Sequence, residues 1–151
     1  MTAVVADAYV VDTGVFIRWF IDQQGYEHAR EFQRQLVDSS VAGTTVDFAR
    51  VEVAGVLRSK GLLAGRLTAE EFIAAVRVID DLGVTVEAIT VDRLEQAAEL
   101  AAHNQLRMYD ALFVQLAMEM DLPVLTSDLK LQHAAARLVR IEVLRGIGDP
   151  A

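Results

Sequence analysis

Four acidic residues lie at or just after the ends of expected strands, or near the start of the helix that follows one. They are Asp12, Glu52, Asp110 and Asp128. In a parallel sheet such strand ends point to one edge, so we expect the four carboxylates to gather there. Clustered carboxylates repel one another unless cations lie between them, and oxygen ligands suit Mg²⁺ or Mn²⁺ rather than zinc. Two such ions can activate a water molecule and stabilise the leaving oxygen of a phosphodiester, which is the chemistry that this pattern favours.

Asp12 and Asp128 also have a purely structural interpretation. Aspartate is a common N-cap, and for either residue alone a cap with no other role is the simpler explanation. Asp110 is harder to explain in this way, because good helix formers precede it and its neighbours on both sides are expected to be buried.

Glu52 is the most informative of the four, because the helix expected around it is apolar over much of its circumference. A carboxylate on such a helix is costly unless it is paired or bound to a metal. A buried salt bridge to Arg18 or Arg50 is the alternative to a metal site. The presence of all four acids together favours the site.

The tripeptide Asp12-Thr13-Gly14 also occurs in aspartic proteases. Those enzymes are all-β proteins, whereas most of this chain has helical periodicity. A match of three residues is weak evidence, and we give the protease interpretation very little weight.

The stretch from Arg107 to Leu131 predicts how two of the acids are positioned. Asp110 leads into an apolar helical face, and Pro123 cannot continue that helix. The run 124–126 is short and wholly apolar apart from its threonine, which is typical of an interior strand. Asp128 follows that strand at its carboxyl end, where open α/β sheets bind their ligands.

Strands and helices alternate along the whole chain, which predicts an α/β fold with a mostly parallel central sheet and helices on both faces, a three-layer arrangement. We expect one domain over residues 1–151, with an N-terminal extension at 1–7 and a tail at 146–151. The expected strands are 8–11, 41–46, 84–89, 124–126 and 140–144, and the main expected helices are 27–37, 48–60, 68–81, 90–104 and 107–121.

Composition excludes several other classes of protein. Apolar residues make up 53% of the chain, enough for a sizeable core, and the absence of cysteine excludes disulfides and thiolate zinc sites. The three histidines show no metal-ligand spacing. No apolar run reaches the length of a membrane span and the N-terminus lacks a basic region, so we expect a cytoplasmic protein with no membrane contact.

The net charge of −8, from 22 acidic and 14 basic residues, argues against nucleic acid as a partner. That argument weakens if several of the acids form one metal site. Basic residues near the acidic motifs could hold phosphates or could be ordinary surface charges. They are Arg18, Arg50, Arg58, Lys60, Arg66, Arg107 and Lys130.

Two aromatic residues and one pair of helices receive further predictions. We expect Trp19 to pack in the core, whereas Tyr109 could either stack on a base or pack against protein. The helices 48–60 and 68–81 are apolar over more than one face, which predicts an interface. The apolar residues concentrate around Val53, Val56, Leu57, Leu62 and Leu63, more than one small core needs, and we expect some of them to form the interface.

Three segments of the sequence resemble the acidic motifs of the PIN-domain family, in the family's order and spacing and over nearly the whole chain. They read VVDTGVFIRWF, FARVEVAGVL and YDALFVQLAMEMDLPVLTSDLKL. The family's four acidic positions match Asp12, Glu52, Asp110 and Asp128, and its hydroxyl residue before the last acid matches Thr126. The extension before the first strand departs from many members without touching the motifs.

The nearest subgroup that the sequence resembles is the VapC-type ribonuclease toxins of toxin–antitoxin pairs. The resemblance implies a Mg²⁺- or Mn²⁺-dependent endoribonuclease, usually a homodimer, that is held inactive by a cognate VapB-type antitoxin. We assign Asp12 and Asp110 as principal metal ligands, Asp128 as a direct or water-mediated ligand, and Glu52 as a further ligand or the general base. One alternative is a non-catalytic PIN scaffold that binds RNA or a protein partner. The other is a metal-free module whose acids are caps and salt bridges.

Overall fold

The computed structural model describes residues 6–146, in which a sheet of five strands has the order β3-β2-β1-β4-β5. Every pair of neighbouring strands is parallel. The α/β fold class predicted from the sequence is therefore confirmed. The predicted N-terminal extension and tail lie largely outside the described residues. The strands are β1 Ala8–Val11, β2 Ala42–Val46, β3 Thr85–Glu87, β4 Val124–Thr126 and β5 Ile141–Val143.

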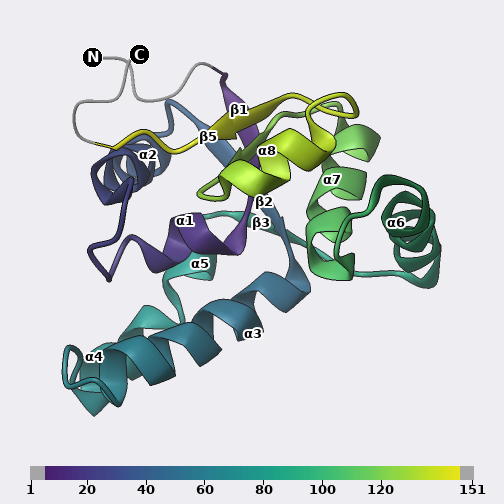
Figure 1. Cartoon of the computed structure of the whole chain (residues 1–151). Helices are drawn as coiled ribbons and strands as arrows, with labels where there is room; N and C mark the ends of the chain where they lie inside the picture. Colours follow the sequence, from purple (N-terminus) through teal and green to yellow (C-terminus); the bar gives the residue numbers. More distant parts are fainter. Residues whose placement is uncertain (1–5, 147–151) are drawn as a thin grey trace.

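Helices cover both faces of this sheet (Figure 1). Side chains alternate between the faces along each strand, so Val11 of β1 joins one hydrophobic cluster and Val10 joins the other. The first cluster lies under α1–α5, and the second lies under α6, α7 and α8. The helices are α1 Thr13–Ile17, α2 Tyr26–Val37, α3 Asp47–Val56, the π-helix η1 Leu57–Leu62, α4 Ala69–Ala75, α5 Val78–Asp81, α6 Val91–Asn104, α7 Met108–Met120 and α8 Leu129–Ala135.

The strand order reverses between β1 and β4. From β1 the chain moves to β2 and β3 on one side, and it then returns to place β4 and β5 on the other side. The carboxyl ends of two adjacent strands with opposite onward directions leave a crevice, and ligands of open α/β sheets bind there. Asp12 follows β1 and Asp128 lies two residues beyond β4, so both acids lie at this point.

The helix predicted over 48–60 is longer and less regular than expected. It starts at Asp47 and continues as the π-helix η1 to Leu62. The two glycines in the segment 60–67 predict a turn there, and the first part of that prediction is wrong. Asp47 is not a side-chain cap of this helix, because its carboxylate accepts a hydrogen bond from the backbone N–H of Ile89 at 3.4 Å. Gly61 is buried in η1, and a Cβ there would lie 2.6 Å from the side chain of Leu67.

The helix predicted over 68–81 is two helices, α4 and α5, separated at residues 76–77. The spacing of Thr68 and Glu71 in the sequence predicts a capping box at its start, and the structure confirms it. The backbone N–H of Glu71 donates to the Thr68 hydroxyl at 3.1 Å, and the Glu71 carboxylate accepts from the Thr68 N–H at 2.8 Å.

The apolar spacing of Leu94, Ala97, Ala98 and Ala101 predicts the inner face of the helix over 90–104, and this prediction is partly wrong. Leu94 is 45% exposed and Ala98 is also exposed, while Ala97 is buried as predicted and Ala101 is half-buried. These two side chains are exposed because α6 lies at the side of the molecule and packs on α7 instead of on the sheet (Figure 1).

An arm formed by α3, η1 and α4 extends away from the sheet (Figure 1). Val53 and Leu57 of this arm are 2% and 0% exposed, so these two belong to the core and do not contribute to the expected interface, which stays a prediction for the rest of the helix pair. Leu63, in contrast, is 63% exposed. Within residues 6–146, no helix combines the length and the apolar character that crossing a membrane requires.

Candidate active site

Asp12 is held by two hydrogen bonds at the carboxyl end of β1. Its Oδ1 accepts from the Thr13 backbone N–H at 2.8 Å, as expected of the N-cap of α1, and its Oδ2 accepts from the Thr126 hydroxyl at 2.6 Å. Burial raises the pKa of Asp12 to about 6, with smaller contributions in the same direction from the charges of Asp110 and Glu52. The two hydrogen bonds oppose this rise. Asp12 is therefore a cap and also part of a cluster of negative charges.

Thr126 connects the two strand ends. Its fully buried hydroxyl donates to Asp12 and accepts from the backbone N–H of Asp128 at 3.0 Å. A hydroxyl has one donor and two acceptor sites, so both bonds can form at once. Asp128 in turn caps α8, with its Oδ1 accepting from the Lys130 N–H at 2.8 Å.

Glu52 lies in α3 and is bound to the other threonine of the site. The Thr13 hydroxyl donates a hydrogen bond to Glu52 Oε1. The salt bridge proposed as an alternative is absent for both arginines. Arg18 donates to backbone carbonyls of its own segment, and Arg50 pairs with Asp80 at 3.0 Å.

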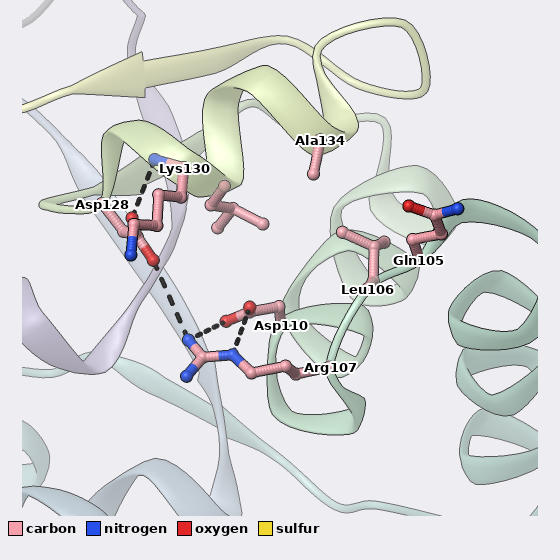
Figure 2. Close-up of a pocket in the computed structure, with 8 residues that line it drawn as sticks. Gln105, Leu106, Arg107, Asp110, Asp128, Lys130 and Ala134 are labelled. Atoms are coloured by element: carbon pink, nitrogen blue, oxygen red, sulfur yellow. Dashed lines mark hydrogen bonds and ion pairs between the residues drawn. The ribbon is translucent and has the colours of Figure 1, made fainter.

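Asp110 lies in the first turn of α7, and its carboxylate faces that of Asp128 with Arg107 between them (Figure 2). Arg107 Nε donates to Asp110 Oδ2 at 3.1 Å, and Arg107 Nη2 lies 3.5 Å from Asp110 Oδ1 and 3.8 Å from Asp128 Oδ2. The Arg107 side chain is 74% exposed, whereas that of Asp110 is only 16% exposed.

A cavity of about 430 Å³ opens beside this group. Polar and charged side chains make up much of its lining, and two of them are cationic. The lining residues are Gln105, Leu106, Arg107, Asp110, Asp128, Lys130, Leu131 and Ala134.

The structure places all four predicted acids around the carboxyl ends of β1 and β4. The charges of Asp110 and Glu52 raise the pKa of Asp12. Asp128 is joined to Asp12 through Thr126, and to Asp110 through Arg107. Glu52 and Asp110 belong to two helices, α3 and α7, and Asp12 and Asp128 follow two strands, so only the tertiary fold gathers them.

The residues present suit a hard divalent cation in their chemistry. Every donor is a carboxylate or hydroxyl oxygen, which is the ligand type that Mg²⁺ and Mn²⁺ prefer. Across the described part of the chain, no three acidic or histidine side chains are arranged closely enough to hold a metal ion. The Arg107 guanidinium contacts the carboxylates of both Asp110 and Asp128 (Figure 2).

Sequence reasoning did not identify the role of Gly14. A Cβ at this position would lie 2.2 Å from Ser127 Oγ and 3.1 Å from a guanidinium nitrogen of Arg18, so a larger residue would force the Ser127 side chain to move. The available signal was a glycine in the first turn of a helix directly after the first acid.

The two aromatic residues singled out in the sequence have different environments. Trp19 is buried as predicted, and its indole N–H donates to the Ala29 carbonyl at 2.9 Å. Tyr109 is half exposed and stacks on Phe48, with ring centroids 5.0 Å apart and planes at 10°. It therefore packs against protein on one face.

Comparison with known proteins adds a family to this geometry. The family model for the PIN domain matches residues 9–137, a span that contains all four acids. Among curated proteins, none matches this sequence significantly.

Several solved structures share the fold. A chain of a toxin–antitoxin complex from Klebsiella pneumoniae has a TM-score of 0.62 at 15% identity, covering 92% of this chain and 99% of that one. Mycobacterium tuberculosis VapC20, described as a sarcin-ricin loop cleaving toxin, has a TM-score of 0.65 at 19% identity, covering 84% and 94%. VapBC-5, a member of the VapBC family of toxin–antitoxin systems from Mycobacterium tuberculosis, has a TM-score of 0.54 at 24% identity, covering 93% and 99%.

Proposed function

Because the chain belongs to the PIN-domain family, we propose that it is a divalent-metal-dependent endoribonuclease that hydrolyses RNA phosphodiester bonds. The observation that carries this proposal is the position of Asp12, Glu52, Asp110 and Asp128 around the carboxyl ends of β1 and β4. Ligands of open α/β sheets bind at the switch point of the sheet, and carboxylates gathered there are suited to bind a cation.

The protein's own residues have separate roles in this proposal. Asp12 and Asp110 would be the principal ligands of Mg²⁺ or Mn²⁺, and Asp128 would be a direct or water-mediated ligand. Thr126 fixes the Asp12 carboxylate, and within residues 6–146 each Asp12 oxygen accepts one hydrogen bond, which leaves further acceptor capacity. A bound divalent cation supplies Lewis-acid activation of water and stabilisation of the leaving oxygen.

Glu52 is the candidate for positioning the attacking water. Its carboxylate is held by the Thr13 hydroxyl rather than by an arginine, so it retains acceptor capacity for a water proton. A general base must lie within hydrogen-bond reach of the proton that it removes. Glu52 is close enough to the site for its charge to raise the pKa of Asp12.

We further propose that the chain is the toxin of a VapBC-type toxin–antitoxin pair, acting on cytoplasmic RNA as a homodimer that a cognate VapB-type antitoxin inhibits. The support is the fold shared with chains of toxin–antitoxin systems. RNA as the substrate is supported by the description of VapC20 as a toxin that cleaves the sarcin-ricin loop.

The test is a nuclease assay of the pure protein against a panel of structured RNAs, with Mg²⁺, with Mn²⁺ and with chelator. We expect discrete cleavage only when a divalent ion is present, and none from an Asp110→Asn variant that melts normally. A folded wild type that binds metal but cleaves no RNA in the panel would instead favour the non-catalytic scaffold.

A further inference from the structure

The geometry points to Arg107 as an internal counterion that a divalent cation displaces from Asp110 and Asp128, after which its guanidinium binds a phosphate of the RNA strand. This inference rests on the proposed function, since it concerns the same site. It adds a residue outside the four acids and an order of events.

The position of Arg107 is the first support. Arg107 is the N-cap residue of α7, and its guanidinium bridges carboxylates that belong to α7 and to the N-cap of α8 (Figure 2). The bridging distances are 3.1 Å to Asp110 and 3.8 Å to Asp128. The pKa of Arg107 is raised by Asp110 first, and then by Asp128 and Asp12, so this cation interacts with three of the four acids.

From this position, the Arg107 guanidinium competes with a metal ion for the carboxylates of Asp110 and Asp128. A metal ion that uses Asp110 and Asp128 as ligands needs the oxygens that Arg107 now contacts, so the guanidinium and the ion exclude each other. The side chain of Arg107 is 74% exposed, and surface ion pairs of this kind contribute little to stability. Displacing Arg107 therefore costs little, and the long side chain can turn into solvent without disturbing the fold.

The cavity supplies the second part of the inference. Arg107 and Lys130 both line the space of about 430 Å³ beside the acids. Once metal neutralises the carboxylates, a released guanidinium at this rim has no carboxylate partner and meets the phosphodiester that the site would bind. Arginine pairs with phosphate through two parallel N–H donors, which suits it to hold one phosphate in register.

The test compares Arg107→Gln with a matched control, Arg34→Gln. Arg34 is also exposed and pairs with an acid three residues away, Glu31, but it lies in α2 outside the site. We expect calorimetry of Mn²⁺ binding, without nucleic acid, to show about threefold to tenfold tighter binding for Arg107→Gln. Arg34→Gln should bind Mn²⁺ with the affinity of the wild type. Arg107→Lys keeps the positive charge but lacks the two parallel N–H donors of the guanidinium, so its Mn²⁺ affinity should lie between those of the wild type and Arg107→Gln.

The phosphate contact has its own measurement. The probe is a short fluorescein-labelled 2′-O-methyl oligonucleotide, checked for integrity by gel after each titration. With Mn²⁺ present, Arg107→Gln should bind it more weakly than wild type, and the slope of log affinity against log salt should fall by about 0.7. Without Mn²⁺ the two proteins should differ little, because Arg107 is then held by the carboxylates.

Three results would overturn the inference. If the wild type binds Mn²⁺ and Arg107→Gln binds it equally or more weakly, then the cation does not displace Arg107. The proposed nuclease function would be unaffected by that result. If Arg107→Gln leaves the slope of log affinity against log salt unchanged, then Arg107 does not contact a phosphate of the oligonucleotide. A folded wild type that binds no Mn²⁺ at all removes both the exchange and the metal-dependent function.

Discussion

Asp12 is the acid whose charge the fold opposes most. Burial raises its pKa from the ordinary value of 3.8 to about 6, so between these values the folded state holds more protons than the unfolded state. Stability of the metal-free protein therefore falls as pH rises from about 4 to about 6 through this group, and no further loss follows above that range. Its full contribution is at most about 3 kcal/mol.

The measurement is urea unfolding in chelator at several pH values from 4 to 8, for wild type and Asp12→Asn. Other groups titrate in the same range, and the pKa values of Asp38 and Glu119 are lowered, which gives a slope of opposite sign. The informative quantity is thus the difference in the free energy of unfolding between the wild type and Asp12→Asn. We expect that difference to grow in favour of Asp12→Asn up to pH 6. A constant difference would show that the carboxyl is ionised without penalty.

Glu52 gives a second prediction at this scale, because the structure decides between two opposite outcomes. A carboxylate in a buried salt bridge would cost about 3–5 kcal/mol when its charge is removed. Glu52 has no arginine partner and accepts from Thr13, which a glutamine oxygen can also do. Glu52→Gln should therefore melt at the wild-type temperature or slightly above it, while cleavage falls about 10²–10⁴-fold.

Thermal melting and a single-turnover cleavage assay check this pair of outcomes. Asp80→Asn is the control, since it removes an acid that does pair with an arginine, at the exposed ion pair with Arg50. It should leave the cleavage rate unchanged. A Glu52→Gln protein that melts much earlier and still cuts at the wild-type rate would make Glu52 structural.

At the scale of elements, the predictions succeeded where local chemistry decides and failed where tertiary position decides. Pro123 ended α7 at the expected place, with Asp121 in the left-handed conformation that closes the helix. Thr68 and Glu71 form the capping box that their spacing predicts. Each of these signals depends only on neighbouring residues.

The misses have tertiary causes. Nothing in the segment Leu57–Leu62 marks a π-helix, whose wider turn depends on how the arm packs. The apolar spacing of α6 does not reveal that this helix lies beside α7 at the edge of the molecule, which leaves Leu94 exposed.

The candidate site shows the same division. Asp12, Asp110 and Asp128 could be found because each stands beside an element boundary, and Glu52 because it is an acid on a largely apolar helix; both signals are visible in the sequence. Arg107 was one of seven basic residues with no distinguishing feature, since its contact with Asp128 joins positions that only the fold brings together. The alternative partners of Glu52 were wrong for the same reason, because Arg50 lies on the side of α3 that meets Asp80.

At the scale of the whole molecule, the protein combines a net charge of −8 with a concentration of acids at one point of the sheet. Only Arg107 among the described residues is seen to bridge two of these acids. A polyanionic substrate would meet an unfavourable potential at this site unless cations neutralise it first. Metal loading before RNA binding is thus expected from charge alone.

Metal should accordingly stabilise the entire fold, since an ion that binds only the folded state shifts the unfolding equilibrium by mass action. At 100 times the dissociation constant the gain is about 2.7 kcal/mol, which corresponds to about 5–10 °C in the melting temperature of a domain of this size. Scanning calorimetry with Mn²⁺, with Mg²⁺ and with chelator measures this gain in melting temperature.

Asp110→Asn should lose most of the gain from metal, and it can melt higher than the wild type in chelator because one repelling charge has gone. Glu95→Gln removes an exposed acid of α6 that is not one of the four acids of the site, and it should keep the full gain. If Asp110→Asn and wild type responded to metal equally, the ion would be binding elsewhere on this acidic surface, and the four carboxylates at β1 and β4 would not form a metal site.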